Sequence, residues 1–280
     1  MLDRPVAWVS QVERGLGQAD PMSVLEAVAS VLGTPLPAQC ASTGACTAST
    51  PAIRALERVL CREQLSRAAA SDCPAPAVSF LRAQADQAWA LTGARRYRDL
   101  AELLTVLLPD LDAALQAVPA ERRAGVYELI GTSYQACSAA LAKLGQFDGA
   151  KTAASRALTA GQRAGNLMLA AASAYLLVCI HMEAGRFSYA EETARQAAAA
   201  LAQPAADGRP EAIALCGALT LQRALIAART SHPAAAQDQL SRARDMADWL
   251  GRAGRGVPDG GFGPGHVALY EIAVSIETGC

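Results

Sequence analysis

KLGQFDGAKTAASRAL at residues 143–158 aligns without a gap on EAGRFSYAEETARQAA at residues 183–198. The two stretches lie 40 residues apart. A fixed period of about 20 to 50 residues is typical of chains built from stacked copies of one small unit. Five positions are identical, namely Gly145 and Gly185, Phe147 and Phe187, Ala150 and Ala190, Ala154 and Ala194, and Ala157 and Ala197. The fold therefore follows from the structure of one repeat.

The shared residues predict a pair of antiparallel helices in each repeat. Glycine ends a helix in the left-handed conformation, so the two glycines mark the turn between the helices. An aromatic residue two positions later fills the space between the helices, and alanines at intervals of three or four let the helices approach closely. A weaker copy follows at residues 228–247, and an earlier one is expected at residues 91–104, with Gly93 and Tyr97 in its turn.

The composition favours an all-α fold. Of the 280 residues, 52% are apolar and 18% are charged, a balance typical of folded chains. Only 5% are aromatic, and the alanine and leucine that dominate the apolar residues favour helices over strands. The formal net charge of −1 argues against a protein that coats nucleic acid by electrostatic attraction alone, but it leaves room for a small domain with a local basic face.

The composition also divides the chain into three parts. Residues 1–33 have a mixed, helical pattern, whereas residues 34–51 read TPLPAQCASTGACTASTP and carry no charge, which is typical of a flexible linker. In residues 52–280, long segments rich in Ala, Leu and Arg alternate with breaks that contain Gly or Pro. We therefore expect a helical repeat domain at 52–280.

The repeat resembles that of the tetratricopeptide family, whose signature positions include the turn glycine, the aromatic residue after it and a small alanine in the second helix. The resemblance covers most of residues 76–277, although the small residue of the first helix is Ser138 in one copy and Val178 in the other. It implies an α-solenoid of helical hairpins, wound into a right-handed superhelix with one concave groove for a peptide or another helix. The candidate groove residues are Gln135, Lys143, Tyr175 and Glu183, with burial in the core as the alternative for Tyr175.

The amino-terminal segment carries a second pattern. WVSQVERG at residues 8–15 and SVLEAVASVLG at residues 23–33 have apolar residues at helical spacing, and Ser23 with Glu26 makes a capping box. These stretches resemble the second half of the helix-turn-helix of Cro and xenobiotic-response-element (XRE) regulators. The resemblance implies that 8–15 is a recognition helix that enters the major groove of DNA. The residues implied to face DNA are Arg4, Ala7, Ser10, Gln11 and Arg14.

The chemistry of these side chains suggests how each would bind. Gln11 can pair with adenine through two hydrogen bonds, and Ser10 can reach a base or a phosphate. Arg4 and Arg14 are candidates for phosphate contacts. The alternative for all of them is a solvated helix face, and the surplus of acids over arginines in residues 1–34 disfavours phosphate binding without help.

Both ends of the sequence are expected to be incomplete. The two helices that precede the recognition helix in the family have no counterpart here, so we expect Met1 to be an internal or misassigned start, or the gene to be a decayed regulator. FGPGHVALYEIAVSIE at residues 262–277 resembles the first helix of a further repeat. Its apolar residues cannot all face one neighbour, so an apolar surface is expected there, together with association with a second copy or some insolubility. These residues are Val267, Tyr270, Val274 and Ile276.

The two resemblances together imply a DNA-binding transcriptional regulator of the kind found in actinobacteria. Its helical array would bind a peptide or small effector and mediate dimerisation. The expected partners are DNA, the effector and a second copy of the chain. The alternative is a tetratricopeptide-type scaffold for protein or peptide interaction that no longer binds DNA.

Enzyme, metal and membrane functions find no support in the sequence. There is no phosphate-binding glycine loop, no H-E-x-x-H and no G-x-S-x-G, so we expect neither catalysis nor a cofactor. The eight cysteines form no C-x-x-C pair and the three histidines are not spaced for zinc, which predicts free thiols in a reducing compartment and no metal. No signal peptide is visible, and the apolar stretch at 168–182 is too short to span a bilayer. We therefore expect a cytoplasmic protein.

Overall fold

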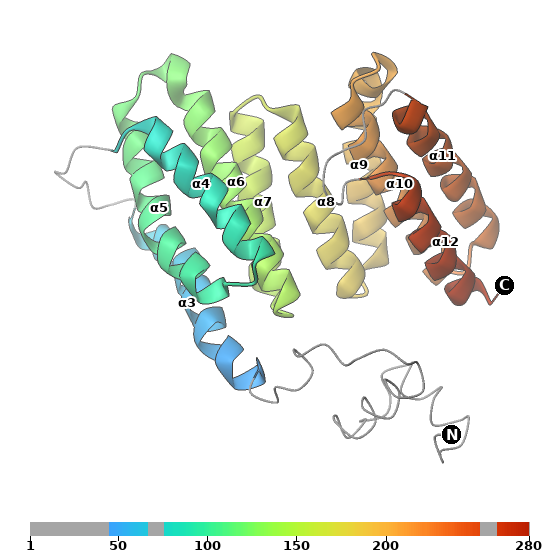
Figure 1. Cartoon of the computed structure of the whole chain (residues 1–280), viewed down its shortest axis with the longest axis horizontal. Coiled ribbons are helices and arrows are strands. Elements are labelled where there is room, and N and C mark those ends of the chain that lie inside the picture. Colours follow the sequence, from blue (N-terminus) through green and yellow to red (C-terminus); the bar gives the residue numbers. More distant parts are fainter. Residues whose placement is uncertain (1–44, 67–75, 253–261, 280) are drawn as a thin grey trace. The chain divides into compact units, whose positions relative to one another are not determined.

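The computed structural model describes residues 45–66, 76–252 and 262–279. The chain divides into one unit of residues 1–51 and a second of residues 52–280. Throughout the described residues every regular element is a helix and no strand occurs, which confirms the predicted all-α class (Figure 1). The predicted DNA-reading segment, 1–33, lies outside the described residues.

Ten α-helices and one short 3-10 helix make up the described part of the chain. In chain order they are α3 (Ala45–Ser66), α4 (Val78–Gly93), α5 (Tyr97–Ala117), η1 (Ala120–Arg122), α6 (Arg123–Lys143), α7 (Phe147–Arg163), α8 (Leu167–Glu183), α9 (Phe187–Ala206), α10 (Pro210–Arg229), α11 (Pro233–Arg252) and α12 (Pro264–Thr278).

Helix α3 begins inside the segment that we predicted to be a flexible linker, 34–51. It starts at Ala45, so residues 45–51 of the predicted linker are helical, although the division of the chain into two units still falls after residue 51. An established helix extends at little cost per added residue. The helix of the repeat domain therefore continues back through Pro51 into the Ala- and Thr-containing end of the uncharged run.

The helices from α4 to α12 pack in two rows. One, which we call the even row, contains α4, α6, α8, α10 and α12, and each member packs against the next. The other, the odd row, contains α5, α7, α9 and α11, and each of these packs against the even-row helices before and after it in the chain. From α5 to α11, the backbones of no two odd-row helices approach each other closely. Helices adjacent in sequence therefore lie side by side (Figure 1).

Six of the turns between consecutive helices share one backbone geometry. At each, one residue has a left-handed φ between 58° and 75°, and the next residue donates its N–H to the carbonyl five residues earlier. The left-handed residues are Arg95, Gly145, Gly165, Gly185, Gly208 and Ser231. The φ values of Gly145 and Gly185, 73° and 67°, confirm that these two turns are equivalent.

The turn before α5 differs from our expectation. Gly93 is the last residue of α4, and Arg95 takes the left-handed position instead. Tyr97 then begins α5, just as Phe147 begins α7 and Phe187 begins α9. We expected glycine at the turn because it adopts a left-handed φ without steric cost. Here Arg95, a residue with a Cβ atom, takes that position with a φ of 58°.

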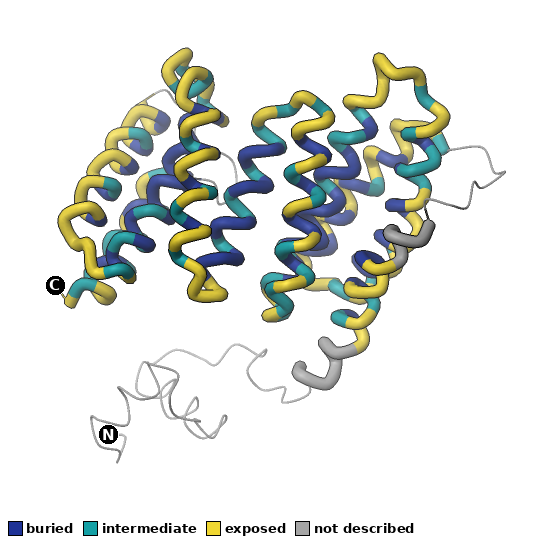
Figure 2. The backbone as a smooth tube through the Cα atoms, turned by 180° about the vertical axis from the view of Figure 1, so that it is seen from behind, coloured by how far each residue is buried: buried dark blue, intermediate teal, exposed yellow. Residues whose placement is uncertain are grey.

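Alanine fills the space between the two rows, as the repeat predicts. The matched alanines are all buried, namely Ala150, Ala154, Ala157, Ala190, Ala194 and Ala197. At Gly161, helices α7 and α8 approach so closely that a Cβ atom would lie 2.7 Å from the backbone nitrogen of Ala170. Figure 2 shows that buried positions, in dark blue, recur along the packed sides of the helices.

Helix α12 has one buried face and one exposed apolar face. Val267 and Val274 are buried in the last core cluster. Leu269, Ile272 and Ile276 are 64%, 60% and 76% exposed. Of the four residues that we expected to leave an apolar surface, only Ile276 is exposed, because Val267, Tyr270 and Val274 all pack against the last core cluster. The exposed apolar face is formed by Leu269, Ile272 and Ile276 instead.

One described helix, α10, is long and apolar enough to cross a membrane. Its apolar window is 67% buried among other helices, which is typical of a core helix in a soluble protein. The stretch at 168–182 lies within α8, where most of its apolar side chains are also buried. The fold is thus compatible with a soluble protein.

Candidate functional site

The five residues predicted to contact DNA lie outside the described part of the chain. They are Arg4, Ala7, Ser10, Gln11 and Arg14. Among the described residues, the candidate site lies on the even-row helices.

Polar side chains join the even-row helices to one another. The Thr92 hydroxyl, near the end of α4, donates to the carbonyl of Ala136 on α6 at 3.3 Å. The Gln135 amide on α6 donates to the Ser173 hydroxyl of α8 at 2.9 Å and to the Leu169 carbonyl at 3.2 Å. Buried polar groups need such partners. These bonds therefore fix how α4, α6 and α8 lie against one another.

The series of polar contacts between even-row helices continues from α8 to α12 through Gln222 on α10. Gln222 is 6% exposed, and its amide nitrogen donates to the Tyr270 hydroxyl of α12 at 2.8 Å and to the Cys179 sulfur of α8 at 3.2 Å. Tyr175 lies one turn before Cys179 on α8. Its hydroxyl interacts with Cys179, Gln222 and Tyr270. We call Tyr175, Cys179, Gln222 and Tyr270 the tyrosine cluster.

Burial keeps the tyrosine cluster neutral. It raises the pKa of Tyr270 to about 12 and the pKa of Cys179 to about 11, and it also raises the pKa of Tyr175. These groups therefore stay protonated near neutral pH and offer hydrogen bonds rather than charges. All three side chains are half-buried, so part of the cluster is open to solvent.

The four predicted groove residues form two stripes on neighbouring even-row helices. Gln135 and Lys143 lie eight residues apart on α6, and Tyr175 and Glu183 lie eight residues apart on α8. Lys143 and Glu183 are exposed at the last positions of their helices. Gln135 is 7% exposed and its amide bonds to α8, so it links helices. Of the four, only Tyr175 belongs to the tyrosine cluster.

Sequence reasoning missed the other three residues of the tyrosine cluster. Cys179 carried a signal, because its spacing of four from both Tyr175 and Glu183 puts all three on one helix face. Gln222 and Tyr270 carried no such signal in the sequence. They join the cluster only because α10 and α12 pack beside α8, which no local pattern specifies.

The described cysteines are free thiols, with Cys137 and Cys216 buried and Cys61 exposed. Among the described residues, no three His, Cys, Asp or Glu side chains gather as ligands for a metal ion. Comparison with protein families, with curated proteins and with solved structures finds no match to the chain. Its function must therefore be inferred from its own residues.

Proposed function

We propose that the chain is a cytoplasmic, DNA-binding transcriptional regulator whose helical array binds a peptide or small effector and mediates dimerisation. The resemblance of residues 8–15 and 23–33 to Cro and XRE regulators supports the DNA-binding part. The tyrosine cluster carries the effector-binding part, because it gathers neutral hydrogen-bonding groups from three even-row helices at partly exposed positions.

The finer fold that we propose is a tetratricopeptide-like α-solenoid. The equivalent turns at Gly145 and Gly185, 40 residues apart, support a repeating hairpin. The two rows support it as well, because each hairpin of α4 to α12 contacts only the helices next to it in the array.

An effector in the tyrosine cluster would act on the contacts between even-row helices. Gln222 donates to both Tyr270 and Cys179. A ligand that replaces either hydrogen bond therefore changes the packing of α10 against α12 or against α8. The angle between neighbouring hairpins then changes, and in a dimer this alters the spacing of the two DNA-reading segments. Coupling of this kind is reciprocal, so operator DNA would change the affinity for the effector by the same factor.

The exposed face of α12 supports the dimer in this proposal. Leu269, Ile272 and Ile276 recur at helical spacing and are all exposed. A run of large apolar side chains on one helix face is typical of a surface that is covered by a partner.

Gel-shift assays test the DNA-binding proposal. This chain and a version extended upstream in frame are each titrated onto the promoter region beside their own gene. Q11A is expected to weaken binding about 5- to 150-fold, because a bidentate contact to adenine is worth about 1–3 kcal/mol. The matched control Q18A lies outside the stretch at 8–15 and is expected to bind like the parent.

The scaffold alternative makes the opposite prediction. If neither version shifts the promoter, even at about 50 mM salt where phosphate contacts are strongest, the regulator proposal fails. A helical array that binds a peptide and no DNA would then remain.

A further inference from the structure

One side of α12 carries only apolar and small side chains. Leu269, Ile272 and Ile276, which we call the α12 face, are exposed and follow one another at spacings of three and four. This is the spacing of the apolar seam between two packed helices. Small residues flank the seam and let a second helix approach closely, namely Gly265, Ala268 and Ser275.

The two acids of α12 are paired within their own chain. Glu277 accepts a hydrogen bond from Arg229 of α10 at 2.9 Å, and Glu271 accepts one from Arg244 of α11. Neither acid is therefore left to select a positively charged partner. Two copies of the α12 face can meet without repulsion between like charges.

Helix α4, at the other end of the even row, has a different surface. It exposes the apolar side chains of Val78, Phe80 and Trp89, but Arg82 and Asp86 are exposed among them. Arg82 lies one turn after Val78 and two turns before Trp89. Covering these charges with the α12 face of another copy would remove them from water without a partner, which is costly. This disfavours a head-to-tail stack of copies.

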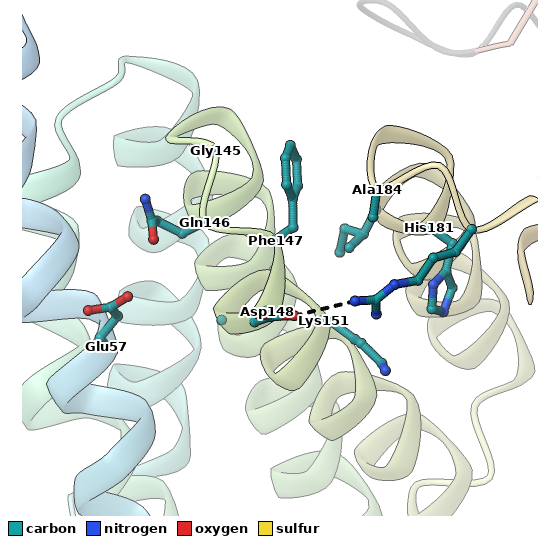
Figure 3. A pocket seen from close by; sticks show the side chains of 11 residues that line it. Glu57, Gly145, Gln146, Phe147, Asp148, Lys151, His181 and Ala184 are labelled. Carbon is teal, nitrogen blue, oxygen red and sulfur yellow. Dashed lines mark ion pairs between the residues drawn. The ribbon is translucent and has the colours of Figure 1, made fainter.

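The pocket at the start of α7 is charged as well (Figure 3). It has a volume of about 380 Å³, and two acids and two bases line it, namely Glu57, Asp148, Lys151 and Arg186. The nearest charged atoms of Asp148 and Arg186 are 4.0 Å apart. An apolar helix face does not suit a surface of this kind. The surface that matches the α12 face best is a second copy of that face.

We propose that two copies of the chain associate through their α12 faces about a two-fold axis. This inference rests on the dimer of the proposed function and names its interface. In such a contact one patch meets itself, so the residue at the centre of the patch lies at the axis. Ile272 is central, because Leu269 precedes it and Ile276 follows it. It therefore packs against Ile272 of the second copy, and the assembly closes at two chains.

Analytical ultracentrifugation of the full chain, without DNA or effector, tests the interface. The parent is expected to sediment as a dimer at micromolar concentration. I272D is expected to sediment as a monomer, because a dimer would bury two like charges at the axis. V106D is the matched control, since Val106 on α5 is 56% exposed and Ile272 is 60% exposed. It is expected to remain a dimer, and circular dichroism checks that both variants are folded.

A mixing experiment tests the two-fold axis itself. I272K alone is expected to be a monomer, whereas an equal mixture of I272D and I272K is expected to regain the dimer at low salt, because opposite charges then meet across the axis. No recovery in the mixture would overturn the proposal, as would a dimer in I272D, a monomer in V106D, a monomeric parent or a parent that assembles beyond the dimer.

The outcome is separable from that of the DNA-binding test. A monomeric parent that shifts promoter DNA would overturn this interface alone. A dimeric parent that shifts no DNA would overturn the regulator and leave the interface standing. The sedimentation of the parent decides the question even if a variant does not fold.

Discussion

Ser231 adopts a φ of 63° at a turn position that glycine holds in four of the six equivalent turns. A side chain in the left-handed region costs about 1 kcal/mol or more, because its Cβ crowds the following carbonyl oxygen. S231G is therefore expected to raise the free energy of unfolding by about 1 kcal/mol in urea titrations. G145A, the reverse change at an equivalent turn, is expected to lower it by a similar amount. A loss of stability in S231G would contradict this account of the turns.

His181 predicts how stability depends on pH. Its pKa is lowered by burial first, and then by Lys151 and Arg186, so the unfolded chain binds the proton more tightly than the folded chain does. The contribution of the neutral ring is complete above about pH 6.5 and is lost as the pH falls below that value. We expect the unfolding free energy to drop between pH 7.5 and pH 5.5, and to drop less in H181Q. Equal pH dependence of the two proteins in urea titrations would refute this role.

At the scale of single helices, two glycines provide a matched comparison. A methyl group at Gly161 of α7 would lie 2.7 Å from the backbone nitrogen of Ala170, whereas nothing lies within 4 Å of one at Gly125 of α6. G161A is expected to cost about 1–3 kcal/mol, because α7 and α8 must move apart. G125A is expected to stabilise the protein by about 0.5–1 kcal/mol, because alanine favours the helix. Thermal unfolding of the two variants should shift in opposite directions.

The helices themselves were largely predictable from the sequence. The match of 143–158 to 183–198 located the turns at Gly145 and Gly185, and the alanine spacing identified the buried faces. Arg95 could not be identified, because nothing in its chemistry marks a left-handed turn. The start of α3 was missed for a related reason. A run of small uncharged residues suits a linker, but it also extends a helix that later residues have begun.

The candidate site was predictable only where its residues share a helix. Tyr175 was predicted as a groove residue from its position on α8, and it is the one member of the tyrosine cluster among the four predicted groove residues. Tyr270 comes from the last described helix and meets Tyr175 only through the stacking of α8, α10 and α12. Contacts of this kind depend on tertiary packing, which local periodicity does not encode.

At the scale of the whole described array, contacts only between neighbouring helices predict local unfolding. L240A removes a side chain that is 2% exposed in the core of α10 to α12, at a cost of about 2–5 kcal/mol. Hydrogen exchange of backbone amides in α10 to α12 should accelerate, while amides in α4 and α6 keep their protection. Uniform acceleration along the chain would show one cooperative unit instead.

The lack of close backbone packing among the odd-row helices α5, α7, α9 and α11 has a mechanical consequence. When the even row bends, no close backbone packing between those four helices has to break, although the contact of α3 with α7, where Arg156 donates to the Leu60 carbonyl, has to adjust. Small rotations at successive hairpins then add, so α4 and α12 move relative to each other by more than any single pair of neighbours does. We therefore expect the described array to bend elastically along its length. The hydrogen bonds of Thr92, Gln135 and Gln222 between even-row helices would resist that bending.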